Sequence, residues 1–347
     1  MARRDPVRRV LRELERAVLR FHLRGHTVLA AVSGGLDSTV LADALASLRR
    51  RGRFTLVIAH VHHGLRAEAD DDQAAVAALA QRLGAPFAAE RVEPAALRKG
   101  TSSRDRPTLQ EAARTLRYAA LHRIADRLGA QRIATAHHAN DQVETVLLRL
   151  LRGTGPDGLG GIPERSPDGR IVRPLLRVSR ADLEGYAAAR ALSWREDPSN
   201  ASPDYARNRL RSALPALARD FNPQLLRAIA DLAEAQRRDC EWIRAEVERE
   251  AGARFTTEGP WLRIDAKDWG ALPETLSRRL AREALTRAGS ARHASRVHLE
   301  RISRFLCDAS PGRRIELPGG VELLCERAGF RLGPLSARSS GDGEIVC

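Results

Sequence analysis

The chain has 347 residues and a formal charge of +14, carried by 58 lysine and arginine residues against 44 aspartate and glutamate residues. This length has room for two or three domains, and the 4% of aromatic residues means that their cores must be aliphatic. Charged residues interrupt every apolar run, which excludes a membrane-spanning helix, and the four cysteines form no Cys-x-x-Cys pair, which excludes a readable zinc module or iron–sulfur cluster. We expect a cytoplasmic, reduced protein with a polyanionic partner, nucleic acid before a membrane surface.

The chain begins with an arginine-rich amphipathic stretch at residues 3–23. It contains three acidic residues and no serine, so we interpret it as a first helix and not as a transit peptide.

A strand-to-helix turn follows. Residues 27–32 are apolar and suit a buried parallel strand, and the apolar spacing after Asp37 is helical. Between them lies the sequence Ser-Gly-Gly-Leu-Asp-Ser at residues 33–38, called the glycine loop below. Glycines allow the backbone to approach a ligand closely, and the amides and dipole of a helix start favour negative charge. The pattern therefore predicts a phosphate-binding loop.

Two other interpretations of the glycine loop compete with this one. It could be a plain connection capped by a serine or aspartate. It could also be a hydrolase nucleophile elbow with Ser33 as the nucleophile, although such an elbow normally lies on an inner strand well into the chain. The ordinary P-loop is excluded, because no Gly-x-x-x-x-Gly-Lys-Ser/Thr pattern occurs.

Three further strands are predicted at residues 55–61, 86–92 and 131–136, with helices at 68–83 and from 109 onward. Strands and helices alternate, which predicts an α/β fold with a doubly wound parallel sheet. Polar groups follow the second and fourth strands, at His62 and at residues 137–144. Because ligands bind at the carboxyl ends of parallel strands, we expect these groups to converge on the glycine loop.

The last of these polar groups contains His137, Asp141 and Glu144. Asp141 and Glu144 have the spacing of a helix cap, so a purely structural role is one interpretation. The functional interpretation is that they face a nucleotide and its Mg²⁺, which carboxylates bind well. Zinc is disfavoured, because His137 and His138 are adjacent and should diverge at a strand end.

A Gly-x-Gly-x-x-Gly match at residues 153–158 follows a helix instead of a strand, so it is not a dinucleotide fingerprint. We expect residues 153–161 to form a flexible loop over the site. Further on, Arg207, Arg209 and Arg211 lie close together, either as a solvated helix face or as contacts for RNA phosphates.

The domain organisation that we expect is a catalytic domain at 1–215, a helical connector at 216–252 and a small α+β C-terminal domain at 253–335. In the last of these we predict strands at 261–264, 314–317, 321–325 and 330–332 and helices at 275–288 and 298–306. Residues 336–347 are rich in serine and glycine, and we expect a disordered tail.

The glycine loop resembles the pyrophosphate loop of the N-type ATP pyrophosphatases, and further motifs in order along the chain are similar to one family, tRNA(Ile)-lysidine synthetase. These motifs are Val-His-His-Gly-Leu-Arg at 61–66, Glu-Ala-Ala-Arg-Thr-Leu-Arg-Tyr at 111–118, the run at 136–145, Arg-Gly at 152–153, Trp-Arg-Glu-Asp at 194–197 and Arg-Asn-Arg at 207–209. The resemblance covers roughly residues 25–215, and Leu-Pro-Gly-Gly at 317–320 extends it into the C-terminal part.

The resemblance implies a two-step reaction on the wobble cytidine of the CAU anticodon of tRNA(Ile), with adenylation by ATP followed by attack of free L-lysine. It implies ATP and Mg²⁺ as cofactors, with phosphates held by the glycine loop. We assign the residues by this resemblance and by their positions: the ATP-binding set is Ser33, Gly34, Gly35, Leu36, Asp37, Ser38 and His62; the metal ligands are Asp37 and Asp141; the catalytic set is Asp37, His137, Asp141, Glu144 and Arg117; and the tRNA-binding set is Arg66, Arg114, Arg152, Arg195, Arg207, Arg209 and Arg211. Arg117 is expected to offset charge on the α-phosphate, and a carboxylate or His137 to accept the proton of the lysine amine.

Two features depart from the family pattern. Many members have two acids where this chain has Asn140 and Asp141, and we expect the chain to lack a second C-terminal domain, as a short-form member does. The alternatives are another tRNA-modifying ATP pyrophosphatase such as a cytidine thiolase, an amidating ATP pyrophosphatase, or a non-catalytic nucleotide-binding module. The sequence leaves open whether the chain forms a homodimer.

Overall fold

The computed structural model describes residues 5–62, 69–93, 95, 108–195, 206–291 and 294–335. The chain divides into two compact units, Met1–Arg237 and Arg238–Cys347. Each is described here by itself.

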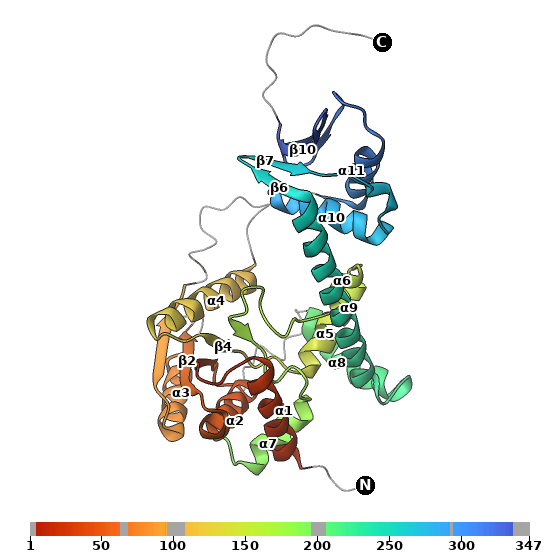
Figure 1. Ribbon diagram of the computed structural model, residues 1–347. Helices are drawn as coiled ribbons and strands as arrows, with labels where there is room; N and C mark the ends of the chain where they lie inside the picture. Colours follow the sequence, from red (N-terminus) through yellow and green to blue (C-terminus); the bar gives the residue numbers. More distant parts are fainter. Residues whose placement is uncertain are drawn as a thin grey trace. The chain divides into compact units, whose positions relative to one another are not determined.

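The first unit contains a five-stranded parallel sheet with the strand order β3-β2-β1-β4-β5 (Figure 1). The strands are β1 (Thr27–Ala31), β2 (Thr55–His62), β3 (Phe87–Arg91), β4 (Arg132–Ala134) and β5 (Ile171–Val172). The first four confirm the strands predicted from the sequence, whereas β5 is too short to leave a pattern. Strand β1 lies in the middle of the sheet, with β2 on one side of it and β4 on the other, so the strand order reverses its direction at β1. Open α/β sheets bind their ligands at the carboxyl ends of the strands at such a switch point.

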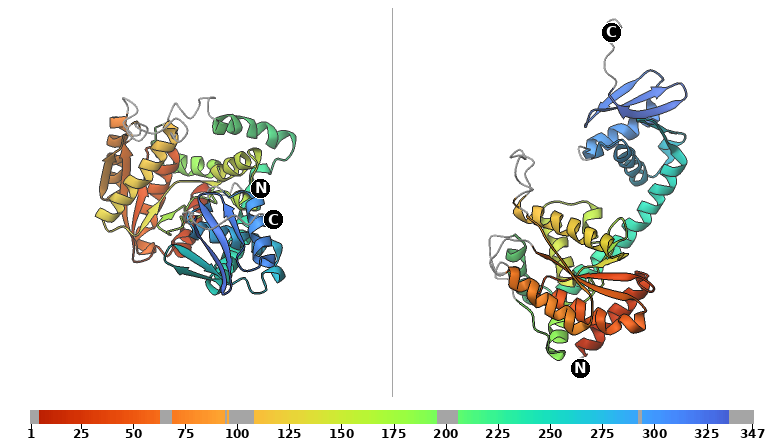
Figure 2. Two further views of the ribbon diagram at one scale, coloured as in Figure 1. Left: turned by 90° about the horizontal axis from the view of Figure 1, so that it is seen from above. Right: turned by 90° about the vertical axis from the view of Figure 1, so that its left-hand side faces the viewer.

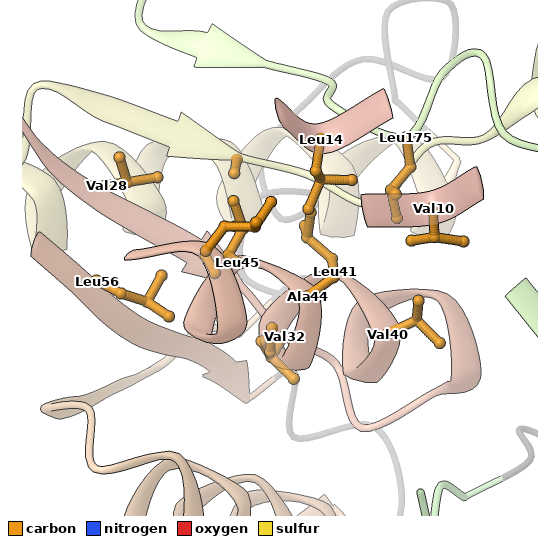
Figure 3. Close-up of a cluster of buried hydrophobic side chains, with 14 of the residues drawn as sticks. Val10, Leu14, Val28, Val32, Val40, Leu41, Ala44, Leu45, Leu56 and Leu175 are labelled. Atoms are coloured by element: carbon orange, nitrogen blue, oxygen red, sulfur yellow. The ribbon is translucent and has the colours of Figure 1, made fainter. Parts of the chain in front are cut away.

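Helices cover both faces of this sheet, which explains why its central strands are buried along most of their length. The helices α1 (Pro6–Arg20), α2 (Leu36–Gly52), α3 (Ala69–Leu83) and α7 (Arg180–Ala189) share one core, and α4 (Leu109–Arg127) packs in the core on the other face. Figures 1 and 2 show α4 on the opposite side of the sheet from α1 and α2. Figure 3 shows part of the first core, in which Leu14 of α1 meets Leu41 of α2, and Leu45 of α2 lies between them and Val28 of β1.

The remaining helices that begin in the first unit are α5 (Ala139–Leu151), the four-residue α6 (Pro156–Leu159), α8 (Ala206–Asp220) and α9 (Leu225–Arg254). Within the loop predicted for residues 153–161, Pro156–Leu159 form the short helix α6, and the segment is hydrogen-bonded to α5; its flexibility stays a prediction. The side chain of Gln142 binds the Ile162 amide, and Arg149 donates to the Gly158 and Gly161 carbonyl oxygens at 3.0 and 2.8 Å. These two side chains satisfy backbone groups that a mobile loop would leave to water.

The second unit is a small α+β domain with an antiparallel sheet in the order β6-β7-β10-β9-β8. Its elements are β6 (Phe255–Glu258), β7 (Trp261–Ile264), η3 (Trp269–Ala271), α10 (Glu274–Arg287), α11 (Arg296–Asp308), β8 (Arg314–Leu317), β9 (Val321–Glu326) and β10 (Gly329–Pro334). The four predicted strands and two predicted helices are confirmed, and β6 is an addition. The tail predicted at residues 336–347 lies outside the described residues.

No helix in the part of the chain that the structure describes combines the length and the apolar character needed to cross a membrane.

Candidate active site

The glycine loop joins β1 to α2 in a compact turn. Gly34 has a φ of 91°, a conformation that glycine adopts without strain. The Ser38 hydroxyl accepts a hydrogen bond from the Ser33 amide at 3.1 Å and donates one to the Gly35 carbonyl oxygen at 3.0 Å, which closes the turn. Gly35 caps α2 without a side-chain hydrogen bond. The start of α2 therefore presents amides and the positive end of its dipole, which suit a phosphate.

Asp37 in the first turn of α2 lies close to the start of α5. Nε2 of His138 is 3.6 Å from a carboxylate oxygen of Asp37 and 3.6 Å from one of Asp141. Nδ1 of His138 lies 3.2 Å from the Asn140 amide at the start of α5, and Nε2 is directed toward both acids. The sheet thus brings together Asp37 and Asp141, called the carboxylate pair below.

Charges within this group favour the ionised forms. Burial by itself would lower the pKa of His138, but its contact with Asp37 and the negative charges of Asp141 and Asp37 raise that pKa overall. Burial likewise opposes ionisation of Asp37, but the neighbouring His138 and Arg180 lower the pKa of Asp37 overall. Asp37 is therefore a carboxylate, with cations on two sides.

Arg180 is a member of this group that the sequence does not identify. Its Nη1 donates to both carboxylate oxygens of Asp37, at 2.8 and 2.9 Å. Its backbone amide donates to Oδ1 of Asn140 at 3.0 Å, which ties the start of α7 to the start of α5. The side chain of Asn140 thus has a structural partner here.

The carboxylate pair fits Mg²⁺ better than a metal held by protein ligands alone. Among the described residues, no group of three or more His, Cys, Asp and Glu side chains is arranged to hold a metal ion. Mg²⁺ is commonly bound by one or two carboxylates and completes its shell with phosphate oxygens and water. Two carboxylates beside a phosphate-binding turn match that donor set.

Glu144, one turn further along α5, is only 1% exposed and faces α8. Arg211 donates to its two oxygens at 2.7 and 3.1 Å, and Nε of Arg207 lies 3.2 Å from it. Arg207 also donates to the Thr145 hydroxyl at 3.0 Å. Two of the arginines predicted to bind tRNA therefore serve as counterions for Glu144 in this structure.

His137 faces in a different direction from its neighbour His138. Its Nδ1 lies 3.0 Å from the Thr135 hydroxyl oxygen. Burial, and then the positive charges of Arg173 and Arg117, lower its pKa well below the usual range. The predicted divergence of the two histidines is present, and His137 is neutral.

The arginines around His137 form what is called the arginine cluster below: Arg114 and Arg117 of α4 and Arg173, which follows β5. Both arginines of α4 lie over the ring of Tyr118, 5.2 and 5.4 Å from its centroid. Arg173 is 6% exposed, and its Nη1 donates to the Pro163 carbonyl oxygen at 2.7 Å. No contact between Arg117 and the glycine loop is present among the described residues, so its expected role at the α-phosphate stays a prediction.

Two more predicted residues lie at the same sheet edge. His62 is buried at the end of β2, with Nε2 3.0 Å from the Asp70 carboxylate. Arg195 forms an ion pair with Asp72 at 3.0 Å, and its backbone amide donates to the Gly34 carbonyl oxygen at 3.0 Å. Segment 193–195 and α3 enclose a cavity of about 360 Å³ whose wall includes Gly34 and Trp194.

The other predicted tRNA contacts do not join this site in the structure. Arg152 follows α5 and Arg209 lies on α8, and both are exposed. Arg66 lies outside the described residues.

The sequence does not identify Arg180 and Arg173 as site residues, because each of them follows a stretch that is too short or too irregular to show a helix or strand pattern. Arg173 comes directly after the two-residue β5, and Arg180 is the residue after a serine helix cap. The only signal in the sequence is the position of Arg173 after a pair of β-branched residues, at a strand end.

Comparison with protein families gives two matches along the chain. Residues 7–217, more than half of it, match a PP-loop domain, and residues 265–332 match a TilS substrate-binding domain. A tRNA(Ile)-lysidine synthase of Methylobacterium sp. (strain 4-46) is 38% identical over 313 residues, which cover 88% of this chain and 87% of that relative. The chain belongs to the tRNA(Ile)-lysidine synthase family.

Other members of the tRNA(Ile)-lysidine synthase family are longer. A Thermus thermophilus member is 40% identical over 90% of this chain, and the Symbiobacterium thermophilum member is 38% identical over 86% of it. The matched regions cover only 57% and 63% of those proteins, so the chain spans little more than half of their length. Among solved structures, the U34-tRNA thiolase NcsA from Methanococcus maripaludis has a TM-score of 0.54 at 18% identity, covering 66% of this chain and 79% of that one. This likeness concerns the fold alone.

Proposed function

We propose that the protein uses ATP to attach free lysine to carbon 2 of the wobble cytidine in the CAU anticodon of tRNA(Ile), giving lysidine, AMP and pyrophosphate. The observation that carries this proposal is the position of the glycine loop beside the carboxylate pair, in a chain of the tRNA(Ile)-lysidine synthase family. The loop suits the phosphates of ATP, and the carboxylates suit the metal that accompanies them.

In the first step, the oxygen on carbon 2 of the cytidine attacks the α-phosphorus of ATP. A bond forms between that oxygen and the phosphorus, and the bond to the leaving pyrophosphate breaks. The amides of the 33–38 loop and the start of α2 would hold the phosphates, with Ser33 and Ser38 shaping the turn. The step matters because an oxygen on a pyrimidine carbon leaves poorly until it becomes a phosphate ester.

In the second step, the ε-amine of lysine attacks carbon 2 of the base, and AMP leaves with the oxygen. The new carbon–nitrogen bond requires an uncharged amine, which then loses a proton. The lowered pKa of His137 keeps this imidazole uncharged with a lone pair, so His137 or a carboxylate of the site can accept that proton.

Asp37 and Asp141 would hold Mg²⁺ at the phosphates. When bound, this ion offsets the charge on the leaving pyrophosphate. In this structure Arg180 neutralises Asp37. If a metal ion bound Asp37 instead, the guanidinium of Arg180 would be available to bind the phosphates.

The tRNA would be recognised by exposed arginines around this edge and by the small C-terminal domain. We propose residues 1–215 as the catalytic domain, 216–252 as the connector and 253–335 as the tRNA-binding domain. The match of residues 265–332 to a substrate-binding domain supports the last assignment. The target base must leave its stack to reach the glycine loop, as enzymes that modify bases require.

The test is to incubate the protein with total tRNA, ATP and radiolabelled lysine and to score label attached to the base. We expect label only in the tRNA(Ile) with a CAU anticodon, together with one pyrophosphate released for each lysine attached. Incorporation of sulfur or ammonia in place of lysine would identify a thiolase or an amidating enzyme. Pyrophosphate release that is independent of tRNA, or no release at all, would contradict the proposal.

A further inference from the structure

Arg195 is one of the arginines that the sequence predicts to bind tRNA, and the structure gives its guanidinium group two acidic partners. Nε of Arg195 lies 3.0 Å from a carboxylate oxygen of Asp72, and Nη1 lies 3.5 Å from one of Asp71, both in the first turn of α3. This distinguishes Arg195 from the arginine cluster, in which the charges that act on Arg117 and Arg173 include no carboxylate of the described residues. Arg195 is therefore not an uncompensated cation at this edge of the sheet.

The main chain of the same residue contacts the glycine loop. The Arg195 amide donates a hydrogen bond to the Gly34 carbonyl oxygen at 3.0 Å. A Cβ added at Gly35 would lie 4.0 Å from the Arg195 carbonyl oxygen, and one added at Gly34 would lie 3.7 Å from Val76 of α3. The loop is therefore packed against two segments, residues 193–195 and α3, and the ion pairs of Arg195 join these segments to each other.

The hydrogen bond to Gly34 fixes the orientation of one peptide group in the loop. The peptide between Gly34 and Gly35 is trans, so its carbonyl and its amide point in opposite directions. Because the Gly34 carbonyl faces segment 193–195, the Gly35 amide faces away from that segment. Two consecutive glycines leave the backbone unusually free, so an external contact is needed to hold this orientation. An amide that is already oriented binds an anion without losing that freedom.

A simpler interpretation is that the acids of α3 only offset the dipole of their own helix. That role accounts for acids in the first turn, but it does not require them to meet an arginine from a distant part of the chain. The preceding acid, Asp70, likewise lies 3.0 Å from Nε2 of His62 at the end of β2. Three consecutive acids of α3 thus contact two separate segments at the edge of the sheet where the glycine loop lies.

We propose that Arg195 is a positioning residue for ATP: held by Asp72 and Asp71, it keeps the Gly34 carbonyl turned away from the phosphates and the Gly35 amide turned toward them. This inference rests on the proposed function, because it requires the glycine loop to bind ATP. It assigns Arg195 to the ATP half of the reaction instead of the predicted contact with tRNA. Partly exposed ion pairs contribute little to folding, so their removal should alter the loop in a protein that is still folded.

The experiment is a double-mutant cycle in the full chain, with the variants Arg195→Gln, Asp72→Asn and the double variant. Binding of ATP is measured by equilibrium dialysis with a labelled non-hydrolysable analogue and Mg²⁺, and binding of tRNA by filter binding. The KM values for ATP and for tRNA are measured in lysine attachment. Arg195→Lys is the conservative variant, because it keeps the positive charge beside the two acids.

A second ion pair in the same unit provides the matched control. Arg170 and Asp126 are joined at 2.6 Å, and they precede β5 and β4, so they lie at the amino edge of the sheet, opposite the glycine loop. The variants Arg170→Gln and Asp126→Asn remove the same kinds of charge, and we expect both to match the wild type in every assay.

We expect Arg195→Gln and Asp72→Asn each to weaken binding of the ATP analogue about 3- to 10-fold, the range expected for the loss of one hydrogen bond, and to raise the KM for ATP in parallel. The double variant should be no weaker than either single variant, because both substitutions remove the same contact. Arg195→Lys should recover part of the loss. Affinity for tRNA should change by less than about twofold, because an arginine that is paired with acids neutralises no phosphate.

The effect of Asp72→Asn on tRNA binding separates the two assignments of Arg195. If Arg195 contacted an RNA phosphate, Asp72→Asn would free its guanidinium and strengthen tRNA binding, and Arg195→Gln would weaken it, both with unchanged ATP affinity. That result would overturn the inference. Equal ATP affinity in all variants, or losses that add up in the double variant, would overturn it as well. Failure of the proposed function looks different, because the wild type itself would then bind no ATP or attach no lysine to tRNA.

Discussion

Two adjacent histidines in this protein have opposite chemistry because they leave the end of β4 in different directions. His138 meets two carboxylates, which raise its pKa, whereas His137 meets arginines in a buried setting, which lowers its pKa. The spacing of apolar residues in the sequence, which predicts helices and strands, does not predict the surroundings of either histidine. At the scale of a residue, the neighbours in space decide the charge.

We expect the two imidazoles to titrate on opposite sides of the ordinary histidine pKa of about 6.5. The raised folded-state pKa of His138 means that its charge stabilises the protein fully below about pH 6.5, and that this contribution is lost as the pH rises through the folded value. The lowered pKa of His137 makes it destabilising as the pH falls below about 6.5. NMR spectra that correlate the ring nitrogens and ring protons of the histidines, recorded as a function of pH, measure the two pKa values, and the variants His138→Gln and His137→Gln assign the signals. Titration of both rings near pH 6.5 would contradict the environments described.

Asp37 is predicted to be essential for the reaction and not for the fold. Asp37→Asn removes the charge that Arg180 and His138 contact and should reduce lysine incorporation by about 100-fold or more, as loss of a metal-holding or charge-stabilising group does. Affinity for tRNA in filter binding should stay within about twofold of the wild type, because exposed arginines supply most of it. Equal incorporation by variant and parent would remove Asp37 from the mechanism. Glu184→Gln, which touches Arg180 from its outer side, is the control.

Gly34 tests the glycine loop with a matched control in the same chain. A Cβ added at Gly34 would have ordinary contact with Val76 at 3.7 Å, so the cost of Gly34→Ala is backbone strain at a φ of 91°. Gly25→Ala carries the same kind of strain, at a φ of 75°, with nothing within 4 Å. We expect each variant to lose about 1–2 kcal/mol of unfolding free energy in urea, and only Gly34→Ala to lose ATP affinity. Equal ATP affinity in the two variants would argue against a phosphate-binding loop.

At the scale of an element, α7 matters because it carries Arg180 to Asp37. A buried network fixes this helix on α2: the Tyr186 hydroxyl donates to Asp43 at 2.7 Å, and Nε of Arg190 donates to the same oxygen at 3.1 Å. Burial, together with this contact with Asp43, raises the pKa of Tyr186 well above its ordinary value. The helix that follows the parallel sheet is thus part of the site's support.

Tyr186→Phe should therefore destabilise the protein without a change in volume. The substitution leaves Asp43 buried with one partner fewer, and we expect a loss of about 1–3 kcal/mol in urea unfolding. Asp43 is only 4% exposed, so water cannot replace the hydroxyl easily. Ser47→Ala, which removes a hydrogen bond to the Asp43 backbone and not to its carboxylate, should cost less. If the two variants were equally stable, the network would not be what holds α7.

For the whole molecule, the charge of +14 predicts binding that is strongly dependent on salt. Neutralising six to ten phosphates lowers affinity about 10³- to 10⁵-fold between 50 and 200 mM salt, and we expect tRNA binding to fall in this range. Arg152→Gln removes an exposed cation and should reduce the slope by about one. Arg254→Gln, in an ion pair with Glu250, should leave the slope unchanged. A shallow slope for the wild type would show that phosphate contacts contribute little.

The alternation of strands and helices was enough to predict the parallel sheet and the position of the glycine loop, because both depend on local patterns. Residues 33–38 form a turn that presents the amides of a helix start, and this property depends on their own sequence and not on the rest of the fold. The anchored segment at 153–161 could not be predicted, because its partners Gln142 and Arg149 are side chains whose direction depends on the packing of α5. The counterions of Glu144 come from α8, 63 and 67 residues away, and no local pattern joins them.

By itself, the sequence determined that this protein has an α/β sheet with a phosphate-binding turn, an α+β C-terminal domain and a positively charged surface, since periodicity, glycine and net charge act locally or as sums. Only the tertiary structure decided which charges face each other. Asp37 is paired with Arg180 and lies near His138, while Arg173 is buried and, among the described residues, forms no ion pair with an acid. The physical reason is that an ionisable group takes its properties from neighbours within a few ångströms, and the fold brings those neighbours from distant parts of the chain.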